Sequence, residues 1–272
     1  MDPVPYLESG LLARAGFSHA FFTRQGGVSE GPFWALNLSP TVGDRAEHVR
    51  ENLGRAAHTL GLGPERMFVA AQPHDRGVLL LQGTESADAV ARTAADAILS
   101  SAPGVGCAVR TADCVPILLA DPETGRVGAV HAGWRGLVRH VIASATERMI
   151  ELGSRRGALL AAFGPHIGPE AFEVGDDVAS EIASASSAEG VVQRTATGKA
   201  LVSLASVVRA QLTSAGLDDA RIEQVPGCTY RDASRFFSYR RDGQRSGRML
   251  ALIVPRAGDG MAARTTLAQG AA

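Results

Sequence analysis

The sequence predicts a single domain of the α/β class (α+β type), in which mixed β-sheets pack against helices. Short apolar runs typical of buried strands are interspersed with segments whose apolar residues recur every three or four positions, as in amphipathic helices. The segments do not follow a strict strand–helix alternation, and GxGxxG and GxxxxGK[ST] phosphate loops are absent. These observations argue against a Rossmann arrangement. We expect one domain over residues 1–256 and a flexible tail over 257–272, where residues are small and polar.

In the first part of the chain, one helix and several short strands are expected. A helix is predicted over Asp44–Leu60, because Val49, Leu53 and Leu60 fall on one side of it. A polar, glycine-rich loop is expected at Thr23–Gly31. The short apolar runs that predict strands are Ala15–Phe22, Met67–Ala71, Val78–Leu81, Asp96–Leu99 and Val105–Arg110.

The second part begins with two apolar runs, Val115–Ala120 and Val127–Val130, around a turn-like segment at 121–125. An amphipathic helix is then predicted from Leu137 to Ile150, with Gly153 and Gly157 after its end. Further helices are expected at Asp176–Ala183 and Lys199–Ala215. Further strands are expected at Ala158–Phe163, Arg221–Val225, Phe236–Arg240 and Arg248–Val254, with Asp242-Gly243 turning the last two.

Composition excludes several classes of protein. The chain has 272 residues, 45% of them hydrophobic, and a formal net charge of −1, so it lacks the basic excess of a nucleic-acid-binding domain. Three cysteines are too few for a disulfide framework. No long apolar run predicts a membrane span, and the first residues do not have the pattern of a signal peptide. We therefore expect a cytoplasmic protein that binds neither nucleic acid nor membrane.

The 26 residues from Thr111 to Gly136 carry the strongest chemical signal. Cys114 stands at the start of one apolar run, and His131 follows the other. If the two strands pair antiparallel, the thiol and the imidazole meet at one edge of a sheet. Gly133-Trp134-Arg135-Gly136 then leads into a helix, whose first amide groups attract anions.

His74 is a candidate third ligand, because it also follows an expected strand directly. Two imidazoles and a thiolate would leave a fourth tetrahedral position open, as in catalytic zinc sites. The spacing alone is a weak signal, since neither CxxC nor HExxH occurs. Neighbouring groups available as outer-shell acceptors or acid–base groups are Gln72, Asp75 and Asp113.

A metal-free interpretation of the same residues stays open. Cys114 would then be a nucleophile, one histidine its base, and Asp113 the orienting group. Alkylation of the thiol with and without a chelator distinguishes the two. Cys107, Cys228 and the histidines at 19, 48, 58 and 140 are expected to be structural or solvated.

Anion binding has separate candidates. Arg24 lies beside the Gly26-Gly27 pair, whose amides can face an anion, and Arg135 opens a predicted helix. If these two arginines converge, a phosphate or carboxylate site results. Asn37 follows in the same region as Arg24.

Several motifs together resemble the YfiH-type laccase-domain family, described as purine nucleoside phosphorylases and formerly as polyphenol oxidases. The resemblance runs from about Phe21 to Ile253. It is carried, in this order, by TRQGGVSEGPFWALNLS, GD–HVRENLGR, QPH, TADCVPILL, AVHAGWRG, GPHIG and FFSYRRDG. Each motif alone is modest, but the combination of TRxGGVSxGPF, TADCVP and HAGWRG is highly specific.

This resemblance implies a His-Cys-His zinc site whose ligands fall, by motif match, on His74, Cys114 and His131. It implies phosphorolysis of adenosine, inosine, guanosine and methylthioadenosine to the base and ribose 1-phosphate, together with adenosine deamination. Both zinc and copper are associated with the family. Nucleosides and phosphate are the implied partners, and the oligomeric state is left unspecified.

Two departures from the family pattern affect the expected site. The family commonly shows QVHG, whereas this chain has Gln72-Pro73-His74-Asp75. Its GPxIG motif often carries a small residue or cysteine where this chain has His166. This extra imidazole is expected either to approach the metal or substrate or to lie on the loop surface. Both departures concern the range of substrates rather than the proposed ligands.

The leading hypothesis is a zinc-dependent purine nucleoside enzyme. Arg24, helped by Arg135, would hold phosphate as it attacks the ribose, and Asp113 or Asp75 would move protons. Asn37, Gln72 and His166 complete the expected substrate site. A copper-dependent phenol oxidase is an alternative, although the chain has no His-x-His pair and only seven histidines. A metal-free cysteine hydrolase and a non-catalytic binding module also stay open as hypotheses.

Overall fold

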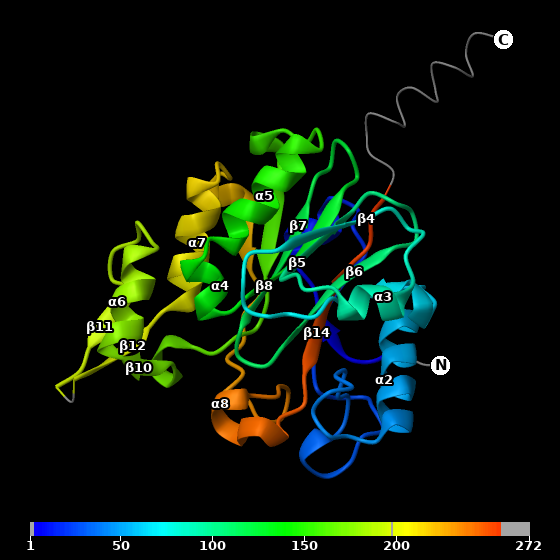
Figure 1. Cartoon of the computed structure of the whole chain (residues 1–272), viewed down its shortest axis with the longest axis horizontal. Helices are drawn as coiled ribbons and strands as arrows, with labels where there is room; N and C mark the ends of the chain where they lie inside the picture. The colour runs from blue at the N-terminus through cyan, green and yellow to red at the C-terminus, as the bar shows by residue number, and fades with distance from the viewer. Residues whose placement is uncertain (1–2, 197, 257–272) are drawn as a thin grey trace, which may run out of the picture.

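The computed structural model describes residues 3–196 and 198–256 of the chain. Two large β-sheets lie face to face, and helices cover their outer faces (Figure 1). Phe21, Val109 and Ile253 of one sheet pack against Ile98 and Leu118 of the other in a single buried cluster. This layered arrangement of mixed sheets and helices confirms the predicted fold class.

The first sheet has five strands and contains both ends of the described chain. Its order is β1 (Tyr6–Leu7), β2 (His19–Phe22), β14 (Met249–Ile253), β6 (Gly106–Thr111) and β3 (Met67–Phe68). Helix α2 (Ala46–Thr59) covers its outer face, where Ala56 and Ala57 share a buried cluster with Leu250. The helix predicted over Asp44–Leu60 is therefore confirmed.

The second sheet has six strands and carries most of the candidate site. Its order is β13 (Ile222–Gln224), β9 (Leu160–Phe163), β7 (Val115–Ala120), β8 (Val127–Ala132), β5 (Ala97–Ser100) and β4 (Val78–Leu81). A large buried cluster joins its outer face to helices α4 (Trp134–Val138), α5 (Val141–Glu151), α6 (Asp176–Ser184) and α7 (Leu204–Ser214).

Smaller elements complete the described part of the fold. A three-stranded sheet has the order β10 (Glu173–Gly175), β12 (Lys199–Val202) and β11 (Val192–Arg194). The short helices are α1 (Gly10–Arg14), α3 (Ala87–Arg92) and α8 (Tyr239–Asp242). Among the described residues, no helix has the length and hydrophobicity needed to cross a bilayer.

Several predicted elements were wrong in part. The helix expected from Leu137 to Ile150 is two helices, because His140 adopts a left-handed conformation (φ 59°) between α4 and α5. Residues Lys199–Val202 form a strand rather than helix, because they pair with β10 on one side and β11 on the other. The strand expected at Ala15–Phe22 is shortened to β2, because Gly16 (φ 79°) follows α1.

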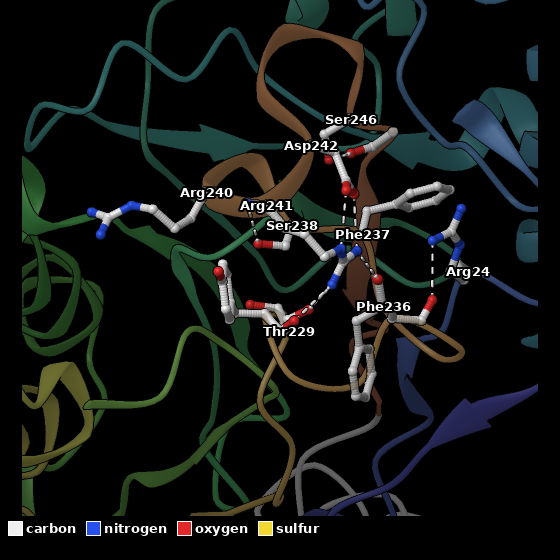
Figure 2. A network of polar contacts seen from close by, with 12 residues as sticks. Arg24, Thr229, Phe236, Phe237, Ser238, Arg240, Arg241, Asp242 and Ser246 are labelled. Atoms are coloured by element: carbon white, nitrogen blue, oxygen red, sulfur yellow. Dashed lines mark hydrogen bonds and ion pairs between the residues drawn. The ribbon is translucent and has the colours of Figure 1, made fainter. Parts of the chain in front are cut away.

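The strand predicted at Phe236–Arg240 does not form. Ser238 instead caps α8, its side chain accepting a hydrogen bond from the Arg241 amide. The side chain of Arg241 donates to the backbone carbonyls of Thr229, Tyr230 and Phe236, which holds the 229–230 loop against the residues before α8 (Figure 2). The tail predicted over 257–272 lies outside the described residues.

The hairpin of β7 and β8 positions two of the predicted ligands, Cys114 and His131. The two strands pair antiparallel, with Val115 opposite Ala132 and Pro116 opposite His131. Cys114, directly before β7, therefore stands beside the end of β8, as the sequence predicted. Helix α4 begins at Trp134, immediately after this strand end.

Candidate metal centre

Three side chains from separate segments converge at this end of the six-stranded sheet. Cys114 precedes β7, His131 lies in β8, and His74 lies in the loop between β3 and β4 with a left-handed backbone (φ 64°). Their ligand atoms all lie within 4.8 Å of one another, and the Cys114 sulfur is 3.9 Å from His74 Nε2. The donor set of two imidazoles and one thiol suits zinc, and copper also binds such ligands.

Asp96, just before β5, forms hydrogen bonds that hold His131 and His74 in place. Its carboxylate lies 2.8 Å from His131 Nδ1, so that nitrogen donates and Nε2 is free for a metal. The same carboxylate accepts the backbone amides of His74 (3.0 Å) and Asp75 (2.7 Å). Asp96 is fully buried, and with these three donors it holds the His74 loop against β8.

The thiol and the imidazole stabilise each other in charged form. Burial opposes ionisation of Cys114, but the nearby imidazoles of His131 and His74 outweigh it and lower its pKa to about 6. Burial likewise disfavours the His131 cation, while the Cys114 thiolate and Asp96 raise its pKa to about 9. A thiolate at neutral pH is the form that a metal ion requires.

Gly133 provides the space between these ligands. A Cβ atom at this position would lie 2.9 Å from the Cys114 sulfur and 2.9 Å from His74 Cδ2. The backbone of Gly133 (φ −74°, ψ 165°) is one that any residue adopts, so the requirement for glycine here is steric. Its absent side chain leaves the three ligands close enough to share one ion.

We expect Gly133→Ala to weaken metal binding while leaving the protein folded. The added methyl group would push apart Cys114 and His74, whereas the backbone conformation stays allowed. Zinc content after dialysis, measured by mass spectrometry, tests this, with circular dichroism as the folding check. Full zinc retention by the folded variant would contradict the steric role. Gly54→Ala is a suitable control, because its added Cβ would meet nothing within 4 Å.

The three candidate ligands line a cavity of about 780 Å³. Trp134, Ile167, Phe172 and Tyr239 supply apolar and aromatic walls suited to a planar ring. Its cationic side chains are Arg110, Arg135, Arg240 and Arg248, while its carboxylate is that of Asp113. The cavity therefore combines a metal-binding group, aromatic surface and an excess of positive charge.

Three of the predicted non-ligand residues lie at this cavity: Gln72, Asp113 and Arg135. Asp113 (φ 88°) accepts hydrogen bonds from the Thr229 hydroxyl and the Arg240 amide, so both of its oxygens are engaged. Arg135 is exposed and stacks over Trp134 at 4.3 Å. The side-chain amide of Gln72 donates to the Arg110 carbonyl and accepts a hydrogen bond from the Arg110 backbone amide.

Arg24 lies apart from the residues that line the cavity. Its guanidinium donates to the carbonyls of Trp34 (2.6 Å) and Ala233 (3.0 Å) and packs over the Phe237 ring at 4.3 Å. Figure 2 shows Arg24 on one side of the Arg241 network and Arg240 on the other. Arg24 and Arg135 are thus not brought together around this cavity, and Arg24 ties two loops to each other.

Asn37, Asp75 and His166 also lie outside the lining of the cavity. Asn37 is fully buried and hydrogen-bonded to the 37–44 loop and the Arg248 amide. The exposed carboxylate of Asp75 is 3.3 Å from Arg139. His166 is buried against Phe163; burial lowers its pKa, and its Nδ1 is 2.9 Å from the Gly164 carbonyl.

Sequence reasoning missed Asp96, Arg110, Tyr239, Arg240 and Arg248. Asp96 stands at the start of an expected strand. No local sequence pattern indicates that it contacts His131, which is 35 residues away. Arg110 and Arg248 stand at the ends of expected strands, where side chains often reach a sheet edge. Tyr239 and Arg240 were assigned to a strand that does not form, which concealed their place at the cavity.

Comparison with known proteins agrees with this architecture. Residues 18–256 match the family described as multi-copper polyphenol oxidoreductase laccase. A purine nucleoside phosphorylase of Deinococcus radiodurans is 42% identical over 254 residues, covering 93% of this chain and 94% of that protein. Purine nucleoside phosphorylase YfiH of Escherichia coli K12 is 37% identical, covering 85% and 90% respectively.

Solved structures show the same fold. The crystal structure of Bacillus licheniformis hypothetical protein YfiH superposes with a TM-score of 0.84 at 30% identity, covering 89% of this chain and 93% of that chain. YlmD from Geobacillus stearothermophilus superposes with a TM-score of 0.86 at 29% identity, covering 93% of this chain and all of that one (100%).

Proposed function

The chain belongs to the multi-copper polyphenol oxidoreductase laccase family, and we propose that it acts as a zinc-dependent purine nucleoside phosphorylase. The observation that carries this proposal is the position of the His74-Cys114-His131 group within an arginine-rich cavity. A nucleoside needs an aromatic-walled pocket, and phosphate needs cationic donors. This cavity offers both beside a group that could bind a metal ion.

The residues present fit a zinc ion. The donor set, the Asp96 carboxylate behind His131 and the space left by Gly133 are all features of a metal site. We propose that His74, Cys114 and His131 hold the ion and leave one coordination position open to the cavity. When bound, zinc supplies Lewis acidity, polarising a substrate oxygen or lowering the pKa of water.

In phosphorolysis, a phosphate oxygen forms a bond to the ribose C1′ while the bond from C1′ to the purine nitrogen breaks. The electron pair of that bond goes to the purine, which takes up a proton and leaves as the free base. Ribose 1-phosphate is the other product. Trp134 and Tyr239 would flank the purine, and Arg135 would offset negative charge that develops at the cavity entrance.

Asp113 is the better placed of the two carboxylates considered for proton transfer. It lines the cavity, whereas the Asp75 carboxylate is paired with Arg139. The hydrogen bonds from Thr229 and Arg240 hold Asp113 in one orientation, which favours a fixed proton path. We further propose adenosine deamination in the same cavity, in which water adds to C6 and ammonia leaves.

Incubation of the purified protein with adenosine, with and without phosphate, tests this function directly. We expect adenine and ribose 1-phosphate only when phosphate is present, and inosine in either condition. Chromatography identifies the products, and metal analysis of the same sample reports zinc or copper. Absence of all three products from a zinc-containing sample would refute the proposal.

The family description raises phenol oxidation by copper as a second candidate function. A multicopper relay needs several ligand clusters, and within residues 3–196 and 198–256 His74-Cys114-His131 is the one group of this kind. A single copper captured at that group cannot deliver four electrons to dioxygen. Oxidation of phenols by copper-loaded protein, without any nucleoside turnover, would favour this candidate instead.

A further inference from the structure

Arg110 is a cationic side chain that lines the cavity. Its Nε atom is buried, and within the described residues it has no hydrogen-bond partner. Burial lowers the pKa of Arg110 to about 10, so the side chain is still positively charged at neutral pH. Burying an unpaired charge is costly unless an anion compensates it. The side chain is therefore prepared for a negatively charged ligand.

Arg248 lies directly before β14, the strand that pairs with the strand of Arg110. The register of β14 and β6 pairs Leu250 with Arg110, and Arg248 precedes Leu250 by two residues. Because side chains alternate between the two faces of a strand, Arg248 and Arg110 project from the same face. Both line the cavity that contains the metal ligands. The Arg248 guanidinium donates to the carbonyls of Ser246 (2.7 Å) and Gly247 (3.0 Å) and makes no ion pair with a described carboxylate.

Two amide side chains, buried Asn37 and half-buried Gln72, hold the backbones of these arginines. Gln72 donates to the Arg110 carbonyl (2.8 Å) and accepts from the Arg110 amide (2.9 Å), replacing the neighbouring strand that β6 lacks there. Asn37 accepts from the Arg248 amide (3.0 Å) and from the Ser39 amide (3.1 Å). Each arginine is thus anchored through its main chain. Arg248 also uses Nη1 on the Ser246 and Gly247 carbonyls, so its other guanidinium N–H groups and those of Arg110 are the donors that face a ligand.

Two hydroxyl groups extend this wall of the cavity. Ser39 and Thr41 line it, and their hydroxyl oxygens are 3.2 Å apart. Ser39 is held in place by the same Asn37 side chain that holds Arg248. The carboxylate of Asp113 accepts from the Thr229 hydroxyl and the Arg240 amide, and its negative charge also attracts Arg248. Among the described residues, no such charge offsets the burial of Arg110. Guanidinium and hydroxyl donors together favour a tetrahedral oxyanion.

We propose that Arg110 and Arg248, with the hydroxyls of Ser39 and Thr41, form the subsite for inorganic phosphate. Gln72 and Asn37 are positioning residues that act through these arginines. The inference rests on the proposed phosphorolysis and deepens it, because it assigns phosphate to a specific wall of the cavity. Asn37 and Gln72, which the sequence predicted to bind substrate, are in this proposal residues that position the two arginines.

Titration of the zinc-containing protein with inorganic phosphate, followed by calorimetry, tests the subsite without requiring turnover. We expect Arg110→Met to weaken phosphate binding by at least about tenfold, because a charge-assisted contact is lost. Arg248→Met should have a similar effect, and Arg110→Lys a smaller one. In kinetics, the KM for phosphate should rise while the KM for the nucleoside stays unchanged. Gln72→Met should show the same selective rise in the KM for phosphate.

Arg126→Met is the matched control. Arg126 also has a buried Nε without a described partner, and burial lowers its pKa, but it lies outside the cavity beside Ser154. This variant should bind phosphate like the unmodified protein. Zinc content and thermal unfolding of every variant confirm that the fold is intact, and Arg110→Lys serves if Arg110→Met does not fold.

The outcomes separate this inference from the proposed function. Phosphate binding that needs Arg110, in a protein that does not cleave nucleosides, supports the subsite and refutes the phosphorylase. Phosphorolysis with an unchanged KM for phosphate in folded Arg110 and Arg248 variants overturns the subsite and supports the enzyme. Adenosine 5′-monophosphate is titrated in parallel. If Arg110 is needed for that nucleotide but inorganic phosphate does not bind, the proposal is overturned in favour of a nucleotide phosphoryl group.

Discussion

Cys114→Ala is expected to abolish metal retention and reduce nucleoside phosphorolysis to background. The thiolate is the one negatively charged donor among the three candidate ligands, and its pKa of about 6 keeps it ionised at neutral pH. Removing even an outer hydrogen bond to a ligand typically lowers metal affinity by about 10- to 100-fold, so loss of the ligand itself should cost more. Metal content after dialysis and the rate of base release from adenosine measure both effects.

Cys107→Ala is the matched control for this substitution. Cys107 is fully buried between the sheets, and burial raises the pKa of its thiol well above the usual range, so it is inert as a ligand. Its replacement should cost stability but leave metal content and activity per folded molecule unchanged. If Cys114→Ala keeps a full equivalent of zinc, the three-ligand site is wrong. If it keeps full activity, the metal has no part in the reaction.

Asp96→Asn is expected to weaken zinc binding by about 10- to 100-fold and to destabilise the fold by about 1–3 kcal/mol. The carboxylate accepts from His131 Nδ1 and from the amides of His74 and Asp75. An asparagine amide nitrogen cannot accept, so at least one of these three donors loses its partner. His131 also loses the charge that orients its ring. Competition with a zinc chelator and denaturant unfolding measure the two quantities.

Asp121→Asn is the control for Asp96→Asn. Asp121 is equally buried and accepts from the Glu123 amide and the Thr124 hydroxyl, but it lies at the opposite end of the β7–β8 hairpin. It should lose a comparable amount of stability without any change in zinc affinity. Zinc binding by Asp96→Asn as tight as that of the control would show that the carboxylate supports the fold and does not tune the ligand.

The candidate metal ligands were predictable because their positions follow from local patterns. Cys114 and His131 flank a short hairpin of two apolar strands, so antiparallel pairing alone brings them to one edge. His74 follows the short strand β3, and its motif match to the family identified it. The anion-binding residues were less predictable. Arg24 and Asn37 stand in glycine-rich and polar segments that suggest ligand binding, yet their hydrogen bonds connect loops.

Pairing between distant segments explains what was missed. Arg110 and Arg248 are separated by 138 residues in the sequence. They become neighbours only because β14 pairs with β6. The strand expected at Phe236–Arg240 has suitable residues, but Arg241 binds the Phe236 carbonyl and Ser238 caps α8, which begins at Tyr239. Conversely, Lys199–Val202 has a helical pattern that pairing with two strands overrides.

By itself, the sequence determined the mixed α/β class, the helix at α2, the β7–β8 hairpin and the approach of Cys114 to His131 at its edge. These depend on periodicity and short-range order, which hydrophobic burial translates directly into local structure. Only the tertiary structure decided which carboxylate supports His131, which arginines face the cavity and which amides hold them in place. Those choices depend on strand order and register between segments far apart in the chain, and no local pattern of residues encodes them.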